Sequence, residues 1–315
     1  MSPSRISAPR LVGRFEGDEP GPLLIAVGAM HGNEPAGVLA IERLLGMLAH
    51  ERAFRPGFAY RGAFVGLVGN VAAYAAGRRY LRYDLNRHLD PLRLAGLRAA
   101  GPEHLAAEDA EAVALTDAVA EAVATHAPRH VVLVDLHTTT ASGGTFSIVA
   151  DDPASRAIAL DLHAPVLLGM LDGISDTSLH YFRTERLGVP TTSLVFESGQ
   201  HREPASVDRA VSALVHTMRS IGAVHPRDVE GRHDELLRAS AEGTPQVVRF
   251  AYKHAIAPAD GFAMRPGYRN FMPVRAGEVL ADDIRGEVRC PRDGLILMPL
   301  YQAQGEDGFF VVEEV

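Results

Sequence analysis

Two histidines and a glutamate in this chain have the types and spacing of metal ligands. His31 and Glu34 form an HxxE pair, whose three-residue spacing lets an imidazole and a carboxylate point at one ion from the same turn. His137, much later in the chain, offers a third ligand. Catalytic zinc commonly takes three protein ligands, His₂Glu among them, and leaves a fourth position for water. This donor set suits Zn²⁺ better than Mg²⁺ or Ca²⁺, so the residues predict one zinc ion per chain.

Each of these residues has a simpler interpretation when it is taken alone. An HxxE pair at the start of a helix also fits a solvated histidine beside a glutamate that complements the helix dipole. His137 alone fits a hydrogen-bonded histidine at the end of a strand. What favours a metal site is the position of the residues relative to the elements that carry them.

The surrounding sequence predicts strands that alternate with helices. Apolar runs predict strands at 23–27, 64–68, 131–134, 145–149 and 193–196, and periodic patterns predict helices from Pro35 onward, at 108–125 and at 205–221. This alternation is typical of an α/β sheet with helices on both faces. Ligands of such sheets lie beyond the carboxyl ends of the strands. His31, His137 and Glu197 each stand at or just after a strand end, which predicts that they meet at one edge of the sheet.

Further polar residues complete the predicted site. Glu197 closes an apolar strand, and beside a metal-bound water it is the candidate general base. Asp135 lies two residues before His137, where it either orients that imidazole or caps a turn. Residues 78–87 (RRYLRYDLNR) carry four arginines, which suit bidentate binding of a carboxylate and stabilisation of an oxyanion. A solvated basic loop is the alternative for this run.

The character of the sequence changes after about residue 225. Residues 225–245 are charged and are predicted to form a linker. From residue 246 onward, short β-type runs are separated by Gly and Pro. The sequence therefore predicts a catalytic α/β domain over 1–240 and a small β domain over 241–315.

Composition limits the classes of function. No apolar run in the 315 residues approaches the roughly 20 that cross a membrane, and the N-terminus lacks the apolar segment of a secretion signal. Cys290 is the only cysteine, which excludes an intrachain disulfide and a thiolate-rich zinc site and fits a reducing cytoplasm. A net charge of −8 argues against a nucleic-acid surface. The expected partner is a small carboxylate-bearing molecule rather than nucleic acid or a membrane, and a homo-oligomer stays open.

Several motifs in order resemble one family. GAMHGNEPAG, the pair Gly69-Asn70, RRYLRYDLNRHLD, DLHTTT and FESG look like the aspartoacylase and succinylglutamate desuccinylase family. The resemblance extends over residues 22–315. It implies a zinc carboxypeptidase-like fold, in which a mixed sheet has helices on both faces and a small C-terminal β domain narrows the substrate channel.

The resemblance implies a role for each residue that matches a motif. His31 and Glu34 of HGNE, with His137 of DLH, would be the zinc ligands. Glu197 of ESG would deprotonate the water and later protonate the leaving amine. Arg79, which precedes the DLNR motif, would polarise the scissile carbonyl.

The same resemblance implies residues that bind the substrate. Asn86 and Arg87 of DLNR would hold a substrate carboxylate. Tyr301 would contact the substrate from the β domain, or it packs within that domain. A further arginine of the family cannot be matched here, and Arg183 and Arg186 are both candidates.

The combined prediction is a zinc-dependent hydrolase that cleaves the amide, or an ester, of a small N-acyl amino acid. A zinc carboxypeptidase acting on short peptides is one alternative, although a β domain over the site would obstruct a long chain. A non-catalytic metal-binding regulator is another, against which the base and the arginines argue. Thr138 stands where the animal enzymes have Asn, so the acyl group and the amine stay open.

Overall fold

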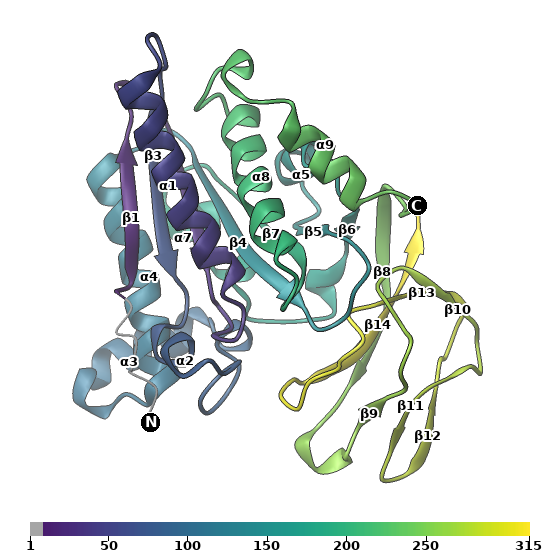
Figure 1. Ribbon diagram of the computed structural model, residues 1–315. Coiled ribbons are helices and arrows are strands. Elements are labelled where there is room, and N and C mark those ends of the chain that lie inside the picture. Colours follow the sequence, from purple (N-terminus) through teal and green to yellow (C-terminus); the bar gives the residue numbers. More distant parts are fainter. Residues whose placement is uncertain (1–8) are drawn as a thin grey trace, which may run out of the picture.

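The computed structural model describes residues 9–315 and has an eleven-stranded mixed sheet at its centre (Figure 1). Its strands, in spatial order, are β1 (Leu11–Glu16), β3 (Arg61–Val68), β2 (Glu19–Gly28), β4 (Val131–Thr139), β7 (Thr191–Gln200), β5 (Phe146–Val149), β6 (Val166–Leu168), β8 (Val247–Ala255), β14 (Asp307–Glu314), β13 (Gly294–Leu297) and β10 (Met272–Val274). β3, β2, β4 and β7 are parallel, whereas β1 and β5 pair antiparallel with β3 and β7. The predicted α/β fold with a mixed sheet is confirmed.

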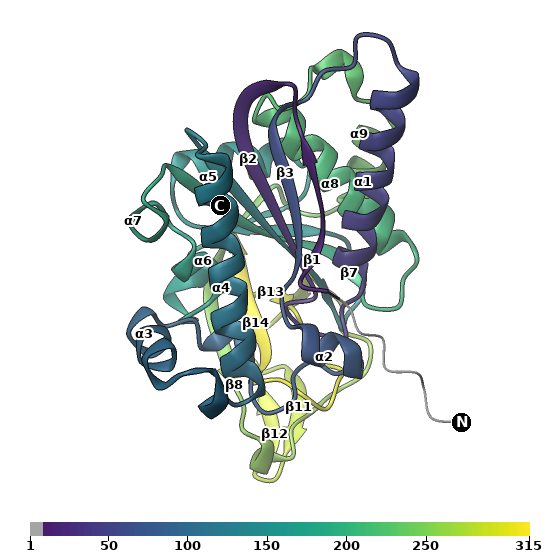
Figure 2. The ribbon, with the colours of Figure 1, turned by 90° about the vertical axis from the view of Figure 1, so that its left-hand side faces the viewer.

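Helices cover both faces of this sheet, as predicted (Figure 2). They are α1 (Ala36–Phe54), α2 (Val71–Ala76), α3 (Pro91–Ala100), α4 (Ala107–His126), α5 (Pro153–Asp161), α6 (Ser178–Tyr181), α7 (Thr184–Leu187), α8 (Ala205–Ser220) and α9 (Arg232–Ser240). Successive strand residues point to opposite faces. Accordingly, Leu24 of β2 packs in one core with Ile41 of α1, and its neighbour Leu23 packs in a second core with Leu115 of α4.

The region predicted as a charged linker contains a helix, so that prediction is wrong. Residues 232–240 form α9, which packs on α8. Only one side of this short helix is buried, with Leu237 fully covered and His233 nearly so. Its other positions are mostly charged or polar, which hides the helical period in the sequence.

The C-terminal segment is joined directly to the central sheet. β8 pairs parallel with β6, and β14 pairs antiparallel with β8. Beyond them, β9 (Ala263–Met264), β11 (Val279–Asp283) and β12 (Gly286–Arg289) form a separate three-stranded sheet, at the lower right of Figure 1. The division into two domains at residue 240 stays a prediction. Within residues 9–315, no helix is long and apolar enough to cross a membrane.

Candidate metal centre and active site

The carboxyl ends of three parallel strands place the predicted residues together. His31 follows β2, His137 lies near the end of β4, and Glu197 lies in β7 directly opposite His137 in the strand register. The turn after β2 is packed closely. A Cβ at Gly32 would lie 2.1 Å from the carbonyl carbon of Ala73, so only glycine fits there.

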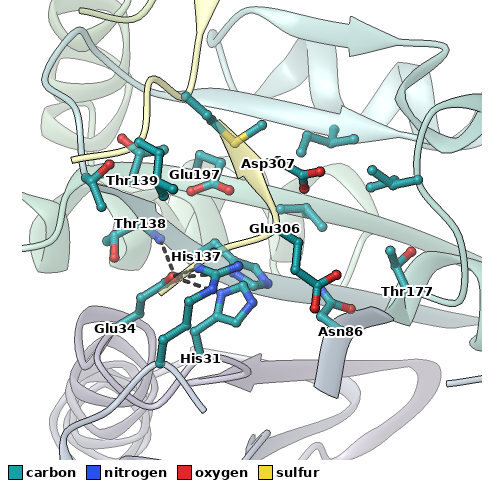
Figure 3. A pocket seen from close by; sticks show the side chains of 18 of the residues that line it. His31, Glu34, Asn86, His137, Thr138, Thr139, Thr177, Glu197, Glu306 and Asp307 are labelled. Carbon is teal, nitrogen blue, oxygen red and sulfur yellow. Dashed lines mark hydrogen bonds and ion pairs between the residues drawn. The ribbon is translucent and has the colours of Figure 1, made fainter. Parts of the chain in front are cut away.

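His31, Glu34 and His137 converge on one point, and all three are buried (Figure 3). Glu34 Oε1 lies 2.9 Å from His31 Nδ1, and Glu34 Oε2 lies 3.2 Å from His137 Nδ1. One ligand atom from each residue falls within 4.8 Å of the other two. The backbone N–H of Thr138 donates to Glu34 Oε2 at 2.9 Å, which holds the carboxylate between the imidazoles. The predicted ligands are thus brought together with the separation that one ion requires.

Each of the two imidazoles also contacts the carboxylate of an aspartate. His31 Nε2 lies 3.1 Å from Asp84 Oδ1, and His137 Nε2 lies 3.1 Å from Asp135 Oδ2. Both rings therefore turn Nδ1 toward Glu34 and Nε2 toward an aspartate. Histidines that bind metals commonly donate their other ring N–H to a carboxylate, which fixes the tautomer and ring orientation. The sequence indicated this role for Asp135 and missed it for Asp84, although Asp84 belongs to the same DLNR motif as Asn86.

The electrostatics of this group suit a divalent cation. Burial by itself favours the neutral form of Glu34, but the adjacent His31 and His137 hold its pKa well below the usual range. Burial also favours the neutral form of Asp84. The neighbouring His31 and Arg79 outweigh this effect and hold the pKa of Asp84 well below the usual range. Ionised carboxylates and buried imidazoles around one point form the His₂-carboxylate donor set of a hydrolytic metal site.

Glu197 is buried in the same pocket, close to these residues. Within residues 9–315, its Oε2 atom has no hydrogen-bond partner. Burial raises the pKa of Glu197 to about 8, despite the opposing charge of His137. A cation beside it would favour the ionised form, so a carboxylate here is suited to exchange a proton with a water or an amine.

Arg79 lies beside two carboxylates of the ligand cluster, those of Glu34 and Asp84. Its Nη1 is 3.5 Å from Glu34 Oε1, and its Nη2 is 2.8 Å from Asp84 Oδ2. Arg79 lines the pocket together with His31 and Glu197. A guanidinium in this position can donate hydrogen bonds to a developing oxyanion.

Asn86 and Arg87 also line the pocket. Asn86 Oδ1 accepts a hydrogen bond from the backbone N–H of Ser178 at 2.8 Å, so the amide NH₂ group is left for a ligand. Arg87 Nη2 lies 2.8 Å from Asp307 Oδ2, and the Arg87 side chain is 17% exposed. The arginine predicted to bind a substrate carboxylate therefore already has an acidic partner.

Tyr301, Arg183 and Arg186 are not brought into this group. The Tyr301 hydroxyl donates to the carbonyl of Arg265 at 3.0 Å, within the C-terminal segment, and Tyr301 borders a neighbouring hollow instead. Arg183 donates through Nε to the carbonyl of Leu179 at 3.0 Å. Arg186 lies over the ring of Tyr181.

The sequence did not indicate the rest of the pocket wall. Met170 and Leu179 lie between β6 and β7, and Leu300, Glu306 and Asp307 come from the C-terminal segment. None of these residues belongs to a short motif. Only the folded sheet brings them to the same edge as the metal ligands.

Comparison with known proteins decides the family. Residues 20–221 match the model of the succinylglutamate desuccinylase/aspartoacylase catalytic domain. The chain belongs to this family. The stretch includes all the candidate metal ligands, Glu197, Arg79, Asn86 and Arg87. The predicted family is therefore confirmed, and membership supports a hydrolase of the desuccinylase/aspartoacylase type.

Solved structures share the fold over nearly the whole chain. A succinylglutamate desuccinylase/aspartoacylase from Rhodobacter sphaeroides has 20% identity and a TM-score of 0.62, over 94% of this chain and 87% of its own. The succinylglutamate desuccinylase from Chromobacterium violaceum has 18% identity and a TM-score of 0.63, over 98% and 95%. The ectoine utilization protein EutE from Ruegeria pomeroyi has 16% identity and a TM-score of 0.63, over 96% and 87%. Among curated protein sequences, no relative was found.

Proposed function

We propose that this family member is a zinc-dependent hydrolase that cleaves the amide bond of a small N-acyl amino acid. One arrangement carries the proposal. The Glu34 carboxylate lies between His31 Nδ1 and His137 Nδ1, at 2.9 and 3.2 Å, and Glu197 stands opposite His137 on the next strand. A three-ligand centre with a carboxylate beside it supports metal-assisted hydrolysis, in which the carboxylate exchanges the proton of the attacking water.

A zinc ion held by His31, Glu34 and His137 would polarise the substrate carbonyl and lower the pKa of a water molecule. Glu197 accepts a proton from this water as its oxygen bonds to the carbonyl carbon. Arg79 donates hydrogen bonds to the oxygen that becomes negative. Glu197 then gives the proton to the nitrogen as the C–N bond breaks. One water is consumed, and the products are a carboxylic acid and an amine.

The substrate is proposed to be a small molecule that bears a carboxylate. Arg87 offers a charged hydrogen-bond donor and Asn86 a neutral one. The two residues are consecutive in the chain, and both line the pocket. Residues of the C-terminal segment, including Leu300 and Glu306, line the same pocket. Their presence supports a compact substrate over an extended peptide.

The test is to purify the full chain, measure its zinc content and assay a panel of N-acyl amino acids for release of the free amine. We expect about one zinc per chain and hydrolysis that depends on it. Stoichiometric zinc without hydrolysis of any acyl amide or ester would instead favour a metal-binding regulator. Preferential release of C-terminal residues from peptides would favour a carboxypeptidase.

A further inference from the structure

One part of the pocket wall is apolar. It is formed by side chains from β5, from the segment between β6 and β7, from β7 itself and from β14, among them Ile148, Met170, Ile174, Leu179, Val195 and Phe310. Except for Ile174, these side chains are at least nine-tenths buried. These five side chains belong to a single hydrophobic core that continues behind the pocket, and Ile174 packs against it.

The positive charges of the pocket are few and already paired. Among its lining residues in the described chain (9–315), Arg79 and Arg87 are the only arginines or lysines. Arg79 is held by Asp84 at 2.8 Å, and Arg87 is held by Asp307 at 2.8 Å. Lys253, 3.6 Å from the other oxygen of Asp307, does not line the pocket.

The pocket also contains acidic groups that a second anion would meet. Asp307 and Glu306 both line it, and Figure 3 shows both carboxylates in the pocket. One substrate carboxylate can share Arg87 with Asp307. A second carboxylate would lie against aliphatic side chains or near these acids, without a cation to compensate the loss of its hydration.

From this geometry we infer the class of substrate, and the inference rests on the function proposed above. The enzyme takes N-acyl amino acids with a single carboxylate and an otherwise uncharged, apolar body. It discriminates against substrates with two or three carboxylates, such as N-acetylaspartate or N-succinylglutamate. The apolar wall excludes the additional charge, and the paired state of Arg87 leaves no free cation to bind it.

The experiment compares two pairs of substrates that differ only by a carboxylate in place of an isopropyl group of similar shape. N-acetylleucine against N-acetylaspartate places the difference on the amine side of the amide. N-(4-methylpentanoyl)glycine against N-succinylglycine places it on the acyl side. In at least one pair we expect the kcat/KM of the monocarboxylate to exceed that of the dicarboxylate by roughly 100-fold, since the second carboxylate would be buried unpaired.

A gain-of-charge variant tests the wall itself. Ile174 lines the pocket and is only partly buried, so Ile174→Arg introduces a cation at little cost in packing. In the substrate pair for which the enzyme shows a preference, we expect Ile174→Arg to shift the ratio of the two kcat/KM values toward the dicarboxylate by about tenfold or more. Ile284→Arg is the matched control, because Ile284 is 74% exposed and lies outside the pocket; it should leave the ratio unchanged.

The outcomes separate the inference from the proposed function. If the dicarboxylates are cleaved as well as or better than their monocarboxylate partners in both pairs, the hydrolase stands and the substrate inference is wrong. A preference for the monocarboxylate that Ile174→Arg does not change would show that the apolar wall does not set this preference, which also overturns the inference. If the zinc-loaded protein releases amine from none of the four compounds and from no other N-acyl amino acid of the panel, both proposals fall.

Discussion

His31 Nε2 lies 3.1 Å from Asp84 Oδ1, so a carboxylate of the DLNR motif orients the proposed metal ligand of the HGNE motif. The other oxygen of Asp84 lies 2.8 Å from Arg79 Nη2. One aspartate therefore connects the metal centre to the arginine proposed to stabilise the oxyanion. We therefore expect two separate properties, the affinity for the metal and the rate at saturating metal, to depend on the same side chain.

Replacing this aspartate should lower both properties. For Asp84→Asn we expect zinc affinity to fall about 10- to 100-fold, because His31 loses its charged partner. We also expect kcat to fall at saturating zinc, because Arg79 loses its anchor. Asp135→Asn is the comparison, since Asp135 contacts His137 but does not pair with Arg79. Chelator competition and assays with excess zinc measure the two effects, and equal kcat losses in both variants would contradict this division of roles.

Glu197→Gln tests the proposed base. The amide keeps the size of the side chain but cannot accept and return a proton, so kcat should fall by about 10²- to 10⁴-fold. Zinc content and KM should stay close to those of the unmodified enzyme, because Glu197 is not one of the three ligands. Metal analysis and steady-state kinetics check this, and a fully active variant would exclude Glu197 as the base.

Removal of the metal should abolish activity reversibly. After chelation we expect no turnover, and recovery with one equivalent of zinc. The number of zinc ions bound per chain also tests a second group of possible ligands. This group consists of His163, His216 and Asp234, whose ligand atoms are likewise closely spaced. Asp234 is already paired with Arg219 at 3.1 Å, so we expect no ion there. Accordingly, His216→Gln should keep one zinc per chain, and His31→Ala should lose it.

Asp307 should limit how strongly Arg87 binds carboxylates. Asp307→Asn removes the negative partner 2.8 Å from Arg87, so KM for a carboxylate-bearing substrate should fall several-fold with little change in kcat. Arg87→Gln should raise KM by about 10- to 100-fold, the value of a charged hydrogen bond. Opposite shifts of KM are the expected signature. If both variants raise KM equally, the pair acts only as structural support for the pocket.

His216 should make stability depend on pH. Its side chain is fully buried, and burial together with Arg219 lowers its pKa to about 4, from 6.5. Below pH 6.5 the unfolded chain therefore binds a proton that the folded chain does not, and stability is lost as the pH falls from 6.5 toward 4. Between pH 7.5 and pH 5 this amounts to roughly 2 kcal/mol.

The measurement for His216 is urea unfolding at several pH values, with and without His216→Gln. The variant has no imidazole to protonate, so its free energy of unfolding should fall less steeply over this range, whatever its stability at pH 7.5. Parallel curves for the two proteins would show that His216 does not supply this dependence.

Local sequence was sufficient to predict the candidate metal-ligand group and the central strands. His31 and Glu34 are three residues apart, so their proximity follows from one turn of chain. β4 is apolar and buried on both faces, as expected for a central parallel strand, and its sequence predicts His137 at the strand end. The rule that the carboxyl ends of parallel strands share an edge then predicts where these residues meet.

Only the tertiary structure decided the outer partners and the character of the pocket. Asp84 reaches His31 because the loop after α2 folds back over the end of β2, where the N–H of Gly32 donates to the carbonyl of Arg79, and no spacing in the sequence records that contact. Ile148, Leu179 and Phe310 look like ordinary core residues, since burial alone does not distinguish a core from a pocket wall. Tyr301 has the right residue type, yet its hydroxyl is bound to backbone within its own segment. Such contacts depend on distances between segments far apart in the chain, which short motifs cannot encode.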